Sequence, residues 1–322
     1  MPHSIILRSH GGPDVMMWEK IKIKNPSQGE ALIKQSRVGL NYIDVYHRTG
    51  EYPLNLPSSI GMEGVGIVID IGEGVKNVKV GDRVGYVMGN PGSYTESRLY
   101  PAERLIKLPN YISDDTAAAV LLKGLTVSYL INKTFPVRKG QKVLLHAAAG
   151  GVGLIACQWL NRIGVEVIGT VGNDEKVDIA RENGCKYPIN YSKDEFASKV
   201  IDITNGKGVP VVFDGVGKET FDGSLECLSS FGTLVSFGAS SGPPPNLYLG
   251  SLAKKSLYVT RPSLGPHTQT AKRIKEISEP LFEILKDGLT VEVKRKYPLK
   301  EAAKAHNDLQ KRKTIGSSIF EV

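Results

Sequence analysis

Cysteines and long apolar runs are both scarce in this 322-residue chain. Its three cysteines, Cys157, Cys185 and Cys227, are far apart and form no C-x-x-C pair. This spacing excludes a disulfide framework and predicts buried, reduced thiols. No run approaches the roughly 18–20 apolar residues that a membrane-spanning helix needs. The first residues lack the basic region and apolar core of a secretory signal, so we expect a cytoplasmic protein without membrane association.

Tracts of a single charge are also missing. The 41 basic residues exceed the 33 acidic residues and give a net charge of +8, but they are scattered along the chain. Basic and aromatic residues are not interleaved as in a stacking platform for single-stranded nucleic acid. The charge suits an anionic cofactor or substrate equally well. We therefore favour a basic enzyme over a nucleic-acid-binding protein.

The first third of the chain is predicted to be rich in short strands separated by glycines. The expected strands cover residues 5–7, 31–38, 64–72 and 80–87. Such spacing indicates a compact, barrel-like domain. Ser113 is predicted to cap a helix with an acidic first turn, and a second helix is expected over residues 124–132.

Strands and helices alternate from residue 143 to about residue 260. We expect strands over residues 143–145, 165–171, 187–190, 209–214, 232–238 and 257–260, with helices from 152 and over 175–183, 194–204 and 219–230. This alternation predicts a parallel, doubly wound sheet. The tail has an amphipathic helix ending near Gly288, a helix from about residue 300 and a last strand over 317–322. It does not continue the alternation, so we expect it to return to the first domain.

A glycine motif follows the first strand of the alternating region. It reads Ala148-x-Gly150-x-x-Gly153, with Ala148 in place of the first glycine of G-x-G-x-x-G. In such a turn, backbone N–H groups and the helix N-terminus approach a pyrophosphate. A tight strand-to-helix turn without a ligand is the alternative interpretation of the motif taken alone.

The strand that follows ends without an acidic residue, in the sequence Gly169-Thr-Val-Gly172. An acidic residue there would bind the ribose hydroxyls of NAD. Its absence favours NADPH over NADH, and Lys176 is placed to pair with a 2′-phosphate. Asp174 and Glu175 are either helix-cap acids or oppose that phosphate. The alternative for Lys176 is an ordinary solvated lysine.

Seven segments resemble the medium-chain dehydrogenase/reductase superfamily, and specifically its quinone oxidoreductase, or zeta-crystallin-like, branch. They are residues 39–44, 61–66, 81–84, 122–127, 147–153, 235–238 and 261–263. The resemblance runs from end to end. It implies an α/β fold, with a doubly wound parallel-sheet Rossmann domain and a GroES-like β-barrel domain formed by both chain ends. The implied boundaries are 1–124 for the first part of the catalytic GroES-like domain, 125–264 for the NADPH-binding Rossmann domain and 265–322 for the return to the catalytic domain.

The zinc alcohol dehydrogenases of the same superfamily provide a comparison for metal binding. Their catalytic zinc needs an early cysteine and a G-H-E motif, where this chain has Asn41 and Met62, and no cysteine precedes Cys157. Neither Asn41 nor Met62 supplies the thiolate or imidazole that zinc favours. We therefore predict no zinc and a structural role for Glu63. Without a Lewis acid, the substrate must accept hydride readily, as a quinone or an activated enone does.

The resemblance also implies where the contacts fall. The candidate catalytic residues are Asn41, Tyr46, Tyr52 and Arg261, because aromatic walls stack on flat acceptors and Asn or Arg donates hydrogen bonds to a developing oxyanion. The candidate cofactor-binding residues are Tyr42, Tyr129, Gly150, Gly151, Val152, Gly153, Gly172, Lys176, Tyr191, Val216, Phe237, Gly238, Ser240, Ser241, Pro262, Ser263 and Arg312. Plainer alternatives are a turn cap for Asn41, half-buried tyrosines for Tyr46 and Tyr52, and a surface helix position for Arg312. His146 is expected to be a packed core histidine.

The sequence thus predicts a zinc-independent NADPH:quinone oxidoreductase that reduces a quinone, or another flat electrophile, in a cleft between the domains. An NADPH-dependent alkenal or enone reductase, a protein that binds AU-rich single-stranded RNA and a cofactor-binding protein without turnover remain as alternatives. Residues 257–260 are apolar and suit an exposed sheet edge. We therefore expect a homodimer through the edge of the Rossmann sheet.

Overall fold

The computed structural model describes residues 1–311 and 313–322 and divides the chain into two compact units. Unit 1 comprises Met1–Leu125, Leu264–Lys286 and Thr290–Val322, and unit 2 comprises Thr126–Ser263 and Asp287–Leu289. The candidate residue Arg312 lies outside the described residues.

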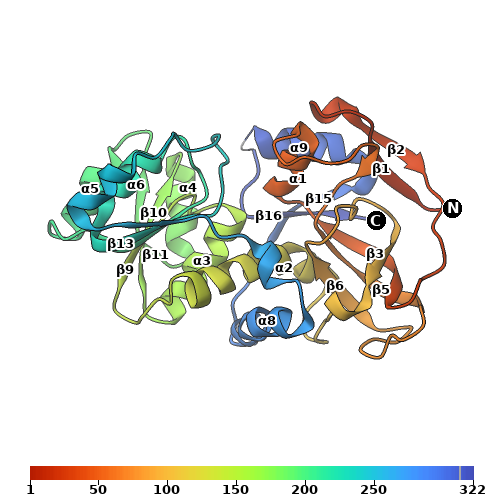
Figure 1. Cartoon of the computed structure of the whole chain (residues 1–322). Coiled ribbons are helices and arrows are strands. Elements are labelled where there is room, and N and C mark those ends of the chain that lie inside the picture. Colours follow the sequence, from red (N-terminus) through yellow and green to blue (C-terminus); the bar gives the residue numbers. More distant parts are fainter. Residues whose placement is uncertain (312) are drawn as a thin grey trace. The chain divides into compact units, whose positions relative to one another are not determined.

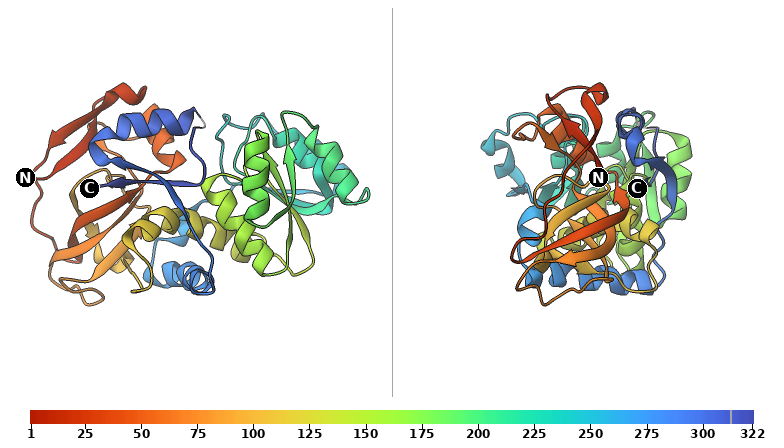
Figure 2. Two further views of the ribbon diagram at one scale, coloured as in Figure 1. Left: turned by 180° about the vertical axis from the view of Figure 1, so that it is seen from behind. Right: turned by 90° about the vertical axis from the view of Figure 1, so that its right-hand side faces the viewer.

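A six-stranded parallel sheet forms the centre of unit 2. Its strands are β9 (Lys142–Leu145), β10 (Glu166–Val171), β11 (Cys185–Asn190), β12 (Val209–Asp214), β13 (Leu228–Ser236) and β14 (Tyr258–Thr260), in the order β11-β10-β9-β12-β13-β14. The helices between them are α3 (Gly151–Arg162), α4 (Asp174–Glu182), α5 (Phe196–Ile203) and α6 (Phe221–Cys227). Figures 1 and 2 show helices on both sides of these strands. The predicted parallel, doubly wound sheet is confirmed.

Burial on both faces explains why the strands of unit 2 are apolar runs rather than alternating patterns. Leu144, Ile168, Val212 and Leu234, one from each of the four central strands, are fully buried in one core cluster. The strand order extends in opposite directions from β9, with β10 on one side and β12 on the other. Ligands of such sheets bind beyond the carboxyl ends of the strands at this point.

Unit 1 is rich in antiparallel strands. It contains β1 (His3–Leu7), β2 (Met16–Lys20), β3 (Glu30–Gly39), β4 (Ser58–Ser59), β5 (Glu63–Ile71), β6 (Arg83–Val87), β7 (Ser97–Pro101), β8 (Ile106–Lys107), β15 (Val293–Pro298) and β16 (Ser317–Glu321). The larger sheet has the order β15-β16-β3-β5-β6-β8, with β7 also pairing β3, and the smaller one has the order β2-β1-β4. Because β16 pairs with β3, both ends of the chain build this unit.

The helices α1 (Tyr42–Thr49), α2 (Asp114–Tyr129), α7 (Leu264–His267), α8 (Ala271–Lys286) and α9 (Ala302–Gln310) complete the fold. Within the described part of the chain, no helix is both long and apolar enough to cross a bilayer. Cys157, Cys185 and Cys227 are buried free thiols.

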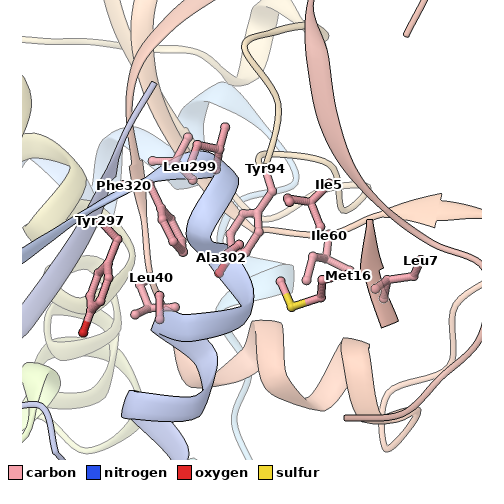
Figure 3. Close-up of a cluster of buried hydrophobic side chains, with 12 residues drawn as sticks. Ile5, Leu7, Met16, Leu40, Ile60, Tyr94, Tyr297, Leu299, Ala302 and Phe320 are labelled. Carbon is pink, nitrogen blue, oxygen red and sulfur yellow. The ribbon is translucent and has the colours of Figure 1, made fainter. Parts of the chain in front are cut away.

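Side chains from both chain ends share one core cluster of unit 1. Figure 3 shows Ile5 and Leu7 of β1 in the same cluster as Tyr297 of β15 and Phe320 of β16, with Tyr94 between these groups. Phe320 and Tyr94 are fully buried. Burying a side chain of this size contributes about 1.5–3 kcal/mol, so the last strands stabilise the domain that the first strands begin.

Two of the predicted helices differ from the structure. The helices expected on either side of Gly124 form the single helix α2. A Cβ at Gly124 would lie 2.6 Å from Leu281 Cδ1 of α8. The glycine therefore permits close packing against α8 and does not mark a break. The helix expected over residues 219–230 ends at Cys227, and β13 begins at Leu228. The predicted cap is confirmed, because Ser113 Oγ accepts the N–H of Thr116 at 3.1 Å.

Candidate active site

The glycine turn joins β9 to α3 in unit 2. Ala147 has a left-handed backbone with φ 55°, and the N–H of Gly150 donates to Ala147 O at 2.8 Å. A Cβ at Gly153 would lie 2.2 Å from Ala147 O and 2.6 Å from Ala148 O, so only glycine lets α3 start this close to the turn. Gly150 occupies the N-cap and has no side chain to accept the first N–H groups of α3. Those groups, on Gly151 and Val152, suit an anion.

Gly172 and Tyr191 lie together beyond the ends of β10 and β11. A Cβ at Gly172 would approach Tyr191 Oη to 2.8 Å, so the tyrosine hydroxyl lies directly over this glycine. Asn173 caps α4, since its Oδ1 accepts the backbone N–H of Lys176 at 2.9 Å. The sequence-predicted residues Gly172, Lys176 and Tyr191 therefore belong to one local cluster.

Asp174 lies in this cluster without being its helix cap. Its Oδ1 accepts a hydrogen bond from Asn190 Nδ2 at 2.7 Å, and its Oδ2 pairs with the Lys193 ammonium. The hydrogen bonds from Lys193 and then Asn190 hold the pKa of Asp174 below its usual value. From the sequence, Asp174 was either a helix-cap acid or a charge that opposes a phosphate. The Lys193 ammonium offsets the negative charge of the Asp174 carboxylate. Lys193 was missed because it follows a different strand of the sheet.

The loops after β12 and β13 are joined to each other by hydrogen bonds. The backbone N–H groups of Phe237 and Gly238 donate to Asp214 O at 2.8 and 3.3 Å. Both the N–H and the Oγ of Ser241 donate to Val216 O, at 2.9 and 2.8 Å. The N–H of Ser240 also donates to Gly215 O. Backbone hydrogen bonds thus hold together the predicted residues of these two loops, which are Val216, Phe237, Gly238, Ser240 and Ser241.

Arg261 follows β14 and reaches back to the end of β13. Its Nη1 donates to Ser236 O at 3.1 Å and to Gly238 O at 2.8 Å. The guanidinium therefore braces the Phe237–Gly238 backbone, with Pro262 and Ser263 next in the chain. Tyr129, in the last turn of α2, is buried in unit 2.

In unit 1, Asn41 occupies the N-cap of α1 and is 4% exposed. Its Nδ2 donates to Glu63 Oε2 at 2.8 Å, and Glu63 Oε1 accepts the N–H of Leu122 at 2.7 Å. Glu63 is fully buried, and burial raises the pKa of its carboxyl against the opposing charge of Lys123. Glu63 thus anchors the Asn41 side chain to the start of β5, and the backbone N–H of Asn41 donates to Asp44 Oδ2 at 3.0 Å in the first turn of α1.

Three tyrosines, Tyr42, Tyr46 and Tyr52, form an aromatic group on and after α1. The Tyr42 and Tyr46 ring centroids lie 5.3 Å apart edge to face, and the Tyr46 and Tyr52 centroids lie 5.0 Å apart. Tyr46 is 7% exposed. Tyr42 and Tyr52 are half-buried, so the accessible part of the group belongs to these two rings, and aromatic rings of this kind stack on flat molecules.

A buried polar network behind α1 was missed from the sequence. The Tyr94 hydroxyl donates to Asp44 Oδ2 at 2.9 Å and lies 2.9 Å from His306 Nε2, while Arg48 Nη1 lies 3.4 Å from His306 Nδ1. Burial raises the pKa of Asp44 to about 7. Burial and the Arg48 charge lower the pKa of His306 to about 3. His306 has no local sequence signal because Tyr94 is 212 residues away.

Met62 is 3% exposed, and its carbonyl accepts the N–H of Met88 at 2.7 Å. Among the residues that the structure describes, no group of three or more His, Cys, Asp or Glu side chains is arranged to hold a metal ion.

Two family models match the chain. Residues 27–110 match the alcohol dehydrogenase GroES-like domain, and residues 151–279 match the zinc-binding dehydrogenase. The chain is 44% identical to a quinone oxidoreductase of Pseudomonas aeruginosa over 323 residues, which cover 99% of both chains. It is 40% identical to a 2-haloacrylate reductase of a Burkholderia species, again over 99% of both. The solved structure of Escherichia coli quinone oxidoreductase complexed with NADPH matches with a TM-score of 0.97 and 43% identity, covering 99% of this chain and 100% of that chain.

Proposed function

Because the chain belongs to the quinone oxidoreductase family, we propose that it is a cytoplasmic, NADPH-dependent enzyme that reduces quinones. The single observation that carries the proposal is the similarity to quinone oxidoreductases over 99% of both chains. The residues of unit 2 fit the cofactor, since the N-terminus of α3 has glycine at its N-cap and no side chain there to accept its first N–H groups.

Each part of unit 2 has a role in holding NADPH in this proposal. The N–H groups of Gly151 and Val152 bind the pyrophosphate at the N-terminus of α3. Gly172, Lys176 and Tyr191 surround the adenosine ribose and its 2′-phosphate. Val216 and the backbone of residues 237–241 border the nicotinamide, where Arg261 braces the loop.

NADPH supplies the hydride when it is bound. The chain's own work is to align the acceptor with it and to exclude water, which is catalysis by proximity. Asn41 is fixed by Glu63, and Tyr46 and Tyr52 pack on each other. We assign Asn41, Tyr46, Tyr52 and Arg261 to the acceptor side. A quinone suits hydride transfer because its reduction product is aromatic.

Lys176→Ala is expected to raise KM for NADPH about 10-fold and to leave KM for NADH unchanged within about twofold, since one charge-assisted contact with the 2′-phosphate is lost. Initial rates with both cofactors would measure this. Lys133→Ala removes a lysine of the same unit that lies outside the cluster and serves as the matched control. Equal changes for both cofactors would contradict the assignment.

Steady-state turnover of a quinone panel against an enone panel, with NADPH saturating, tests the proposed reaction. We expect faster reduction of quinones. The second candidate is an enone or haloacrylate reductase, which the 40% identity to a 2-haloacrylate reductase favours. Fast enone reduction with negligible quinone turnover would replace the first candidate by the second.

We also propose that the chain forms a homodimer through the edge of the unit 2 sheet. β14 is the last strand in the order of that sheet, and an open edge invites pairing. Phe231, Tyr248, Leu249 and Tyr258 are 61–79% exposed and lie on β13 or β14 or in the segment that connects them. Light scattering should give twice the mass of one chain, and Tyr258→Glu should shift it to that of one chain. A monomeric wild type would contradict this proposal.

A further inference from the structure

A chain of buried polar side chains lies beneath the ends of the central strands of unit 2. His146 Nδ1 is 2.8 Å from Thr170 Oγ1, and His146 Nε2 is 2.9 Å from Ser224 Oγ. Ser224 Oγ donates to Asp214 Oδ2 at 3.1 Å. All four residues are at most 1% exposed. None of the roles assigned above involves this chain of polar side chains.

The partners of Asp214 determine which group donates in each of these hydrogen bonds. Asp214 accepts the N–H groups of Val216 and Gly217 on Oδ1, at 2.8 and 3.0 Å, and the hydroxyls of Thr220 and Ser224 on Oδ2. A carboxylate only accepts hydrogen bonds, so the Ser224 hydroxyl donates its only proton to Asp214. Its oxygen must therefore accept a hydrogen bond from His146 Nε2–H. The Nδ1 of His146 then accepts from Thr170. Burial lowers the pKa of His146, so the ring is neutral, with its proton on Nε2.

The two ends of this chain lie in different parts of the proposed cofactor site. His146 opens the glycine turn, and the N–H of Ala148 donates to the carbonyl of Thr170 at 3.0 Å. Asp214 holds the Val216–Gly217 turn through its carboxylate, and its own carbonyl holds the Phe237–Gly238 backbone. One end therefore reaches the pyrophosphate turn and the other reaches the loops next to the nicotinamide.

We propose that His146, Ser224 and Asp214 are positioning residues that hold the nicotinamide loops in register with the pyrophosphate turn. This inference rests on the proposed function. The three side chains touch no reacting atom and act through the backbone that Asp214 holds. Replacing Ser224 breaks the side-chain link between the loops and the turn, whereas the Asp214 carboxylate and the backbone bond from the N–H of His146 to Phe213 O, at 3.0 Å, stay in place.

Ser224→Ala tests the link by comparing NADPH with 2′-phospho-adenosine diphosphoribose, which lacks the nicotinamide. We expect the Kd of NADPH to rise about 10-fold and kcat to fall by a similar factor, with the Kd of the truncated analogue constant within about twofold. Thr204→Ala removes another buried hydroxyl of unit 2, which accepts the Gly208 N–H at 3.0 Å. It should leave the ratio of the two Kd values unchanged.

Asp214→Asn tests the hydrogen-bond directions on which the inference depends. The asparagine Nδ2 donates to Ser224 Oγ, Ser224 then donates to His146 Nε2, and the histidine proton moves to Nδ1. Thr220 can redirect its hydroxyl to Gly217 O, which lies 3.3 Å away. Nitrogen-15 NMR of the histidine side chains should therefore report the Nε2–H form in the wild type and the Nδ1–H form in the variant.

Two outcomes would overturn the inference. Equal weakening of NADPH and of the truncated analogue would mean that the chain supports only the pyrophosphate turn. An unchanged Kd ratio in both variants would mean that it positions nothing. Wild-type quinone turnover is measured separately. If it is absent, the proposed function fails, whereas the difference between the two Kd values still decides the positioning role.

Discussion

Replacing Gly153 by alanine is expected to weaken NADPH binding by about 10- to 100-fold and to lower the Tm. The new Cβ would lie 2.2 Å from Ala147 O and 2.6 Å from Ala148 O, and both are backbone atoms that cannot rotate away. Relieving this contact moves α3 off the turn, at about 1–3 kcal/mol. The N–H groups of Gly151 and Val152 then lose their alignment on the pyrophosphate. Fluorescence titration with NADPH and a thermal melt measure both effects.

Gly150→Ala separates a direct effect on NADPH binding from an effect on the stability of the fold. A Cβ there would lie 3.1 Å from Ala147 O, and Gly150 has φ −79°, a conformation that any residue adopts. We therefore expect a smaller fall in Tm than for Gly153→Ala, since alanine is a poorer N-cap than glycine but needs only a small shift here, together with weaker NADPH binding because the added methyl crowds the N–H groups proposed to hold the phosphate. Wild-type NADPH affinity in both variants would place the pyrophosphate elsewhere.

The fold could be predicted from the sequence where the residues of a segment alone show whether it is a strand, a helix or a turn. The apolar runs at residues 143–145 and 209–214 are too short for helices and are separated by helical patterns, so a parallel sheet follows from alternation. The glycine turn was recognised because its constraint is local, since a Cβ at Gly153 collides with residues only five and six positions earlier. These signals need no knowledge of distant contacts.

Features that depend on distant partners were not predictable. Gly124 was interpreted as a helix boundary, but the atom that requires glycine there belongs to Leu281. The charge of Asp174 is offset by Lys193, which follows the neighbouring strand. Asn41 was identified as a candidate, yet its partner Glu63 is contributed by a different strand. In each case the tertiary contact decides the role, and a single sequence does not contain it.

The histidines of unit 1 are expected to make the protein sensitive to acid. Burial lowers the pKa of His47 to about 4, and burial with the Arg48 charge lowers that of His306 to about 3. Above pH 6.5 each imidazole ring is neutral in both the folded and the unfolded protein. As the pH falls below 6.5, the unfolded chain binds protons that the folded chain refuses, so the free energy of unfolding falls by about 1.4 kcal/mol per pH unit for each such histidine.

Asp44 has the opposite sign. Its folded pKa of about 7 exceeds its ordinary value of 3.8, so the folded state binds the extra proton between these values. Its contribution to stability is complete below pH 4 and is lost as the pH rises to 7. Between pH 4 and 6.5, Asp44 therefore offsets one of the two histidines, so unit 1 is less sensitive to acid than His47 and His306 alone would make it.

Two substitutions in this network should change the acid dependence in opposite directions. His306→Gln keeps a hydrogen-bonding side chain but does not titrate, so the slope of unfolding free energy against pH between 4 and 6.5 should fall by about 1.4 kcal/mol per unit. Asp44→Asn removes the offset, so the slope should steepen by a similar amount. Urea unfolding at a series of pH values measures both, with exposed His10→Gln as the control. Parallel slopes for the wild type and His306→Gln would show that His306 takes up a proton within the folded protein, against the burial that lowers its pKa.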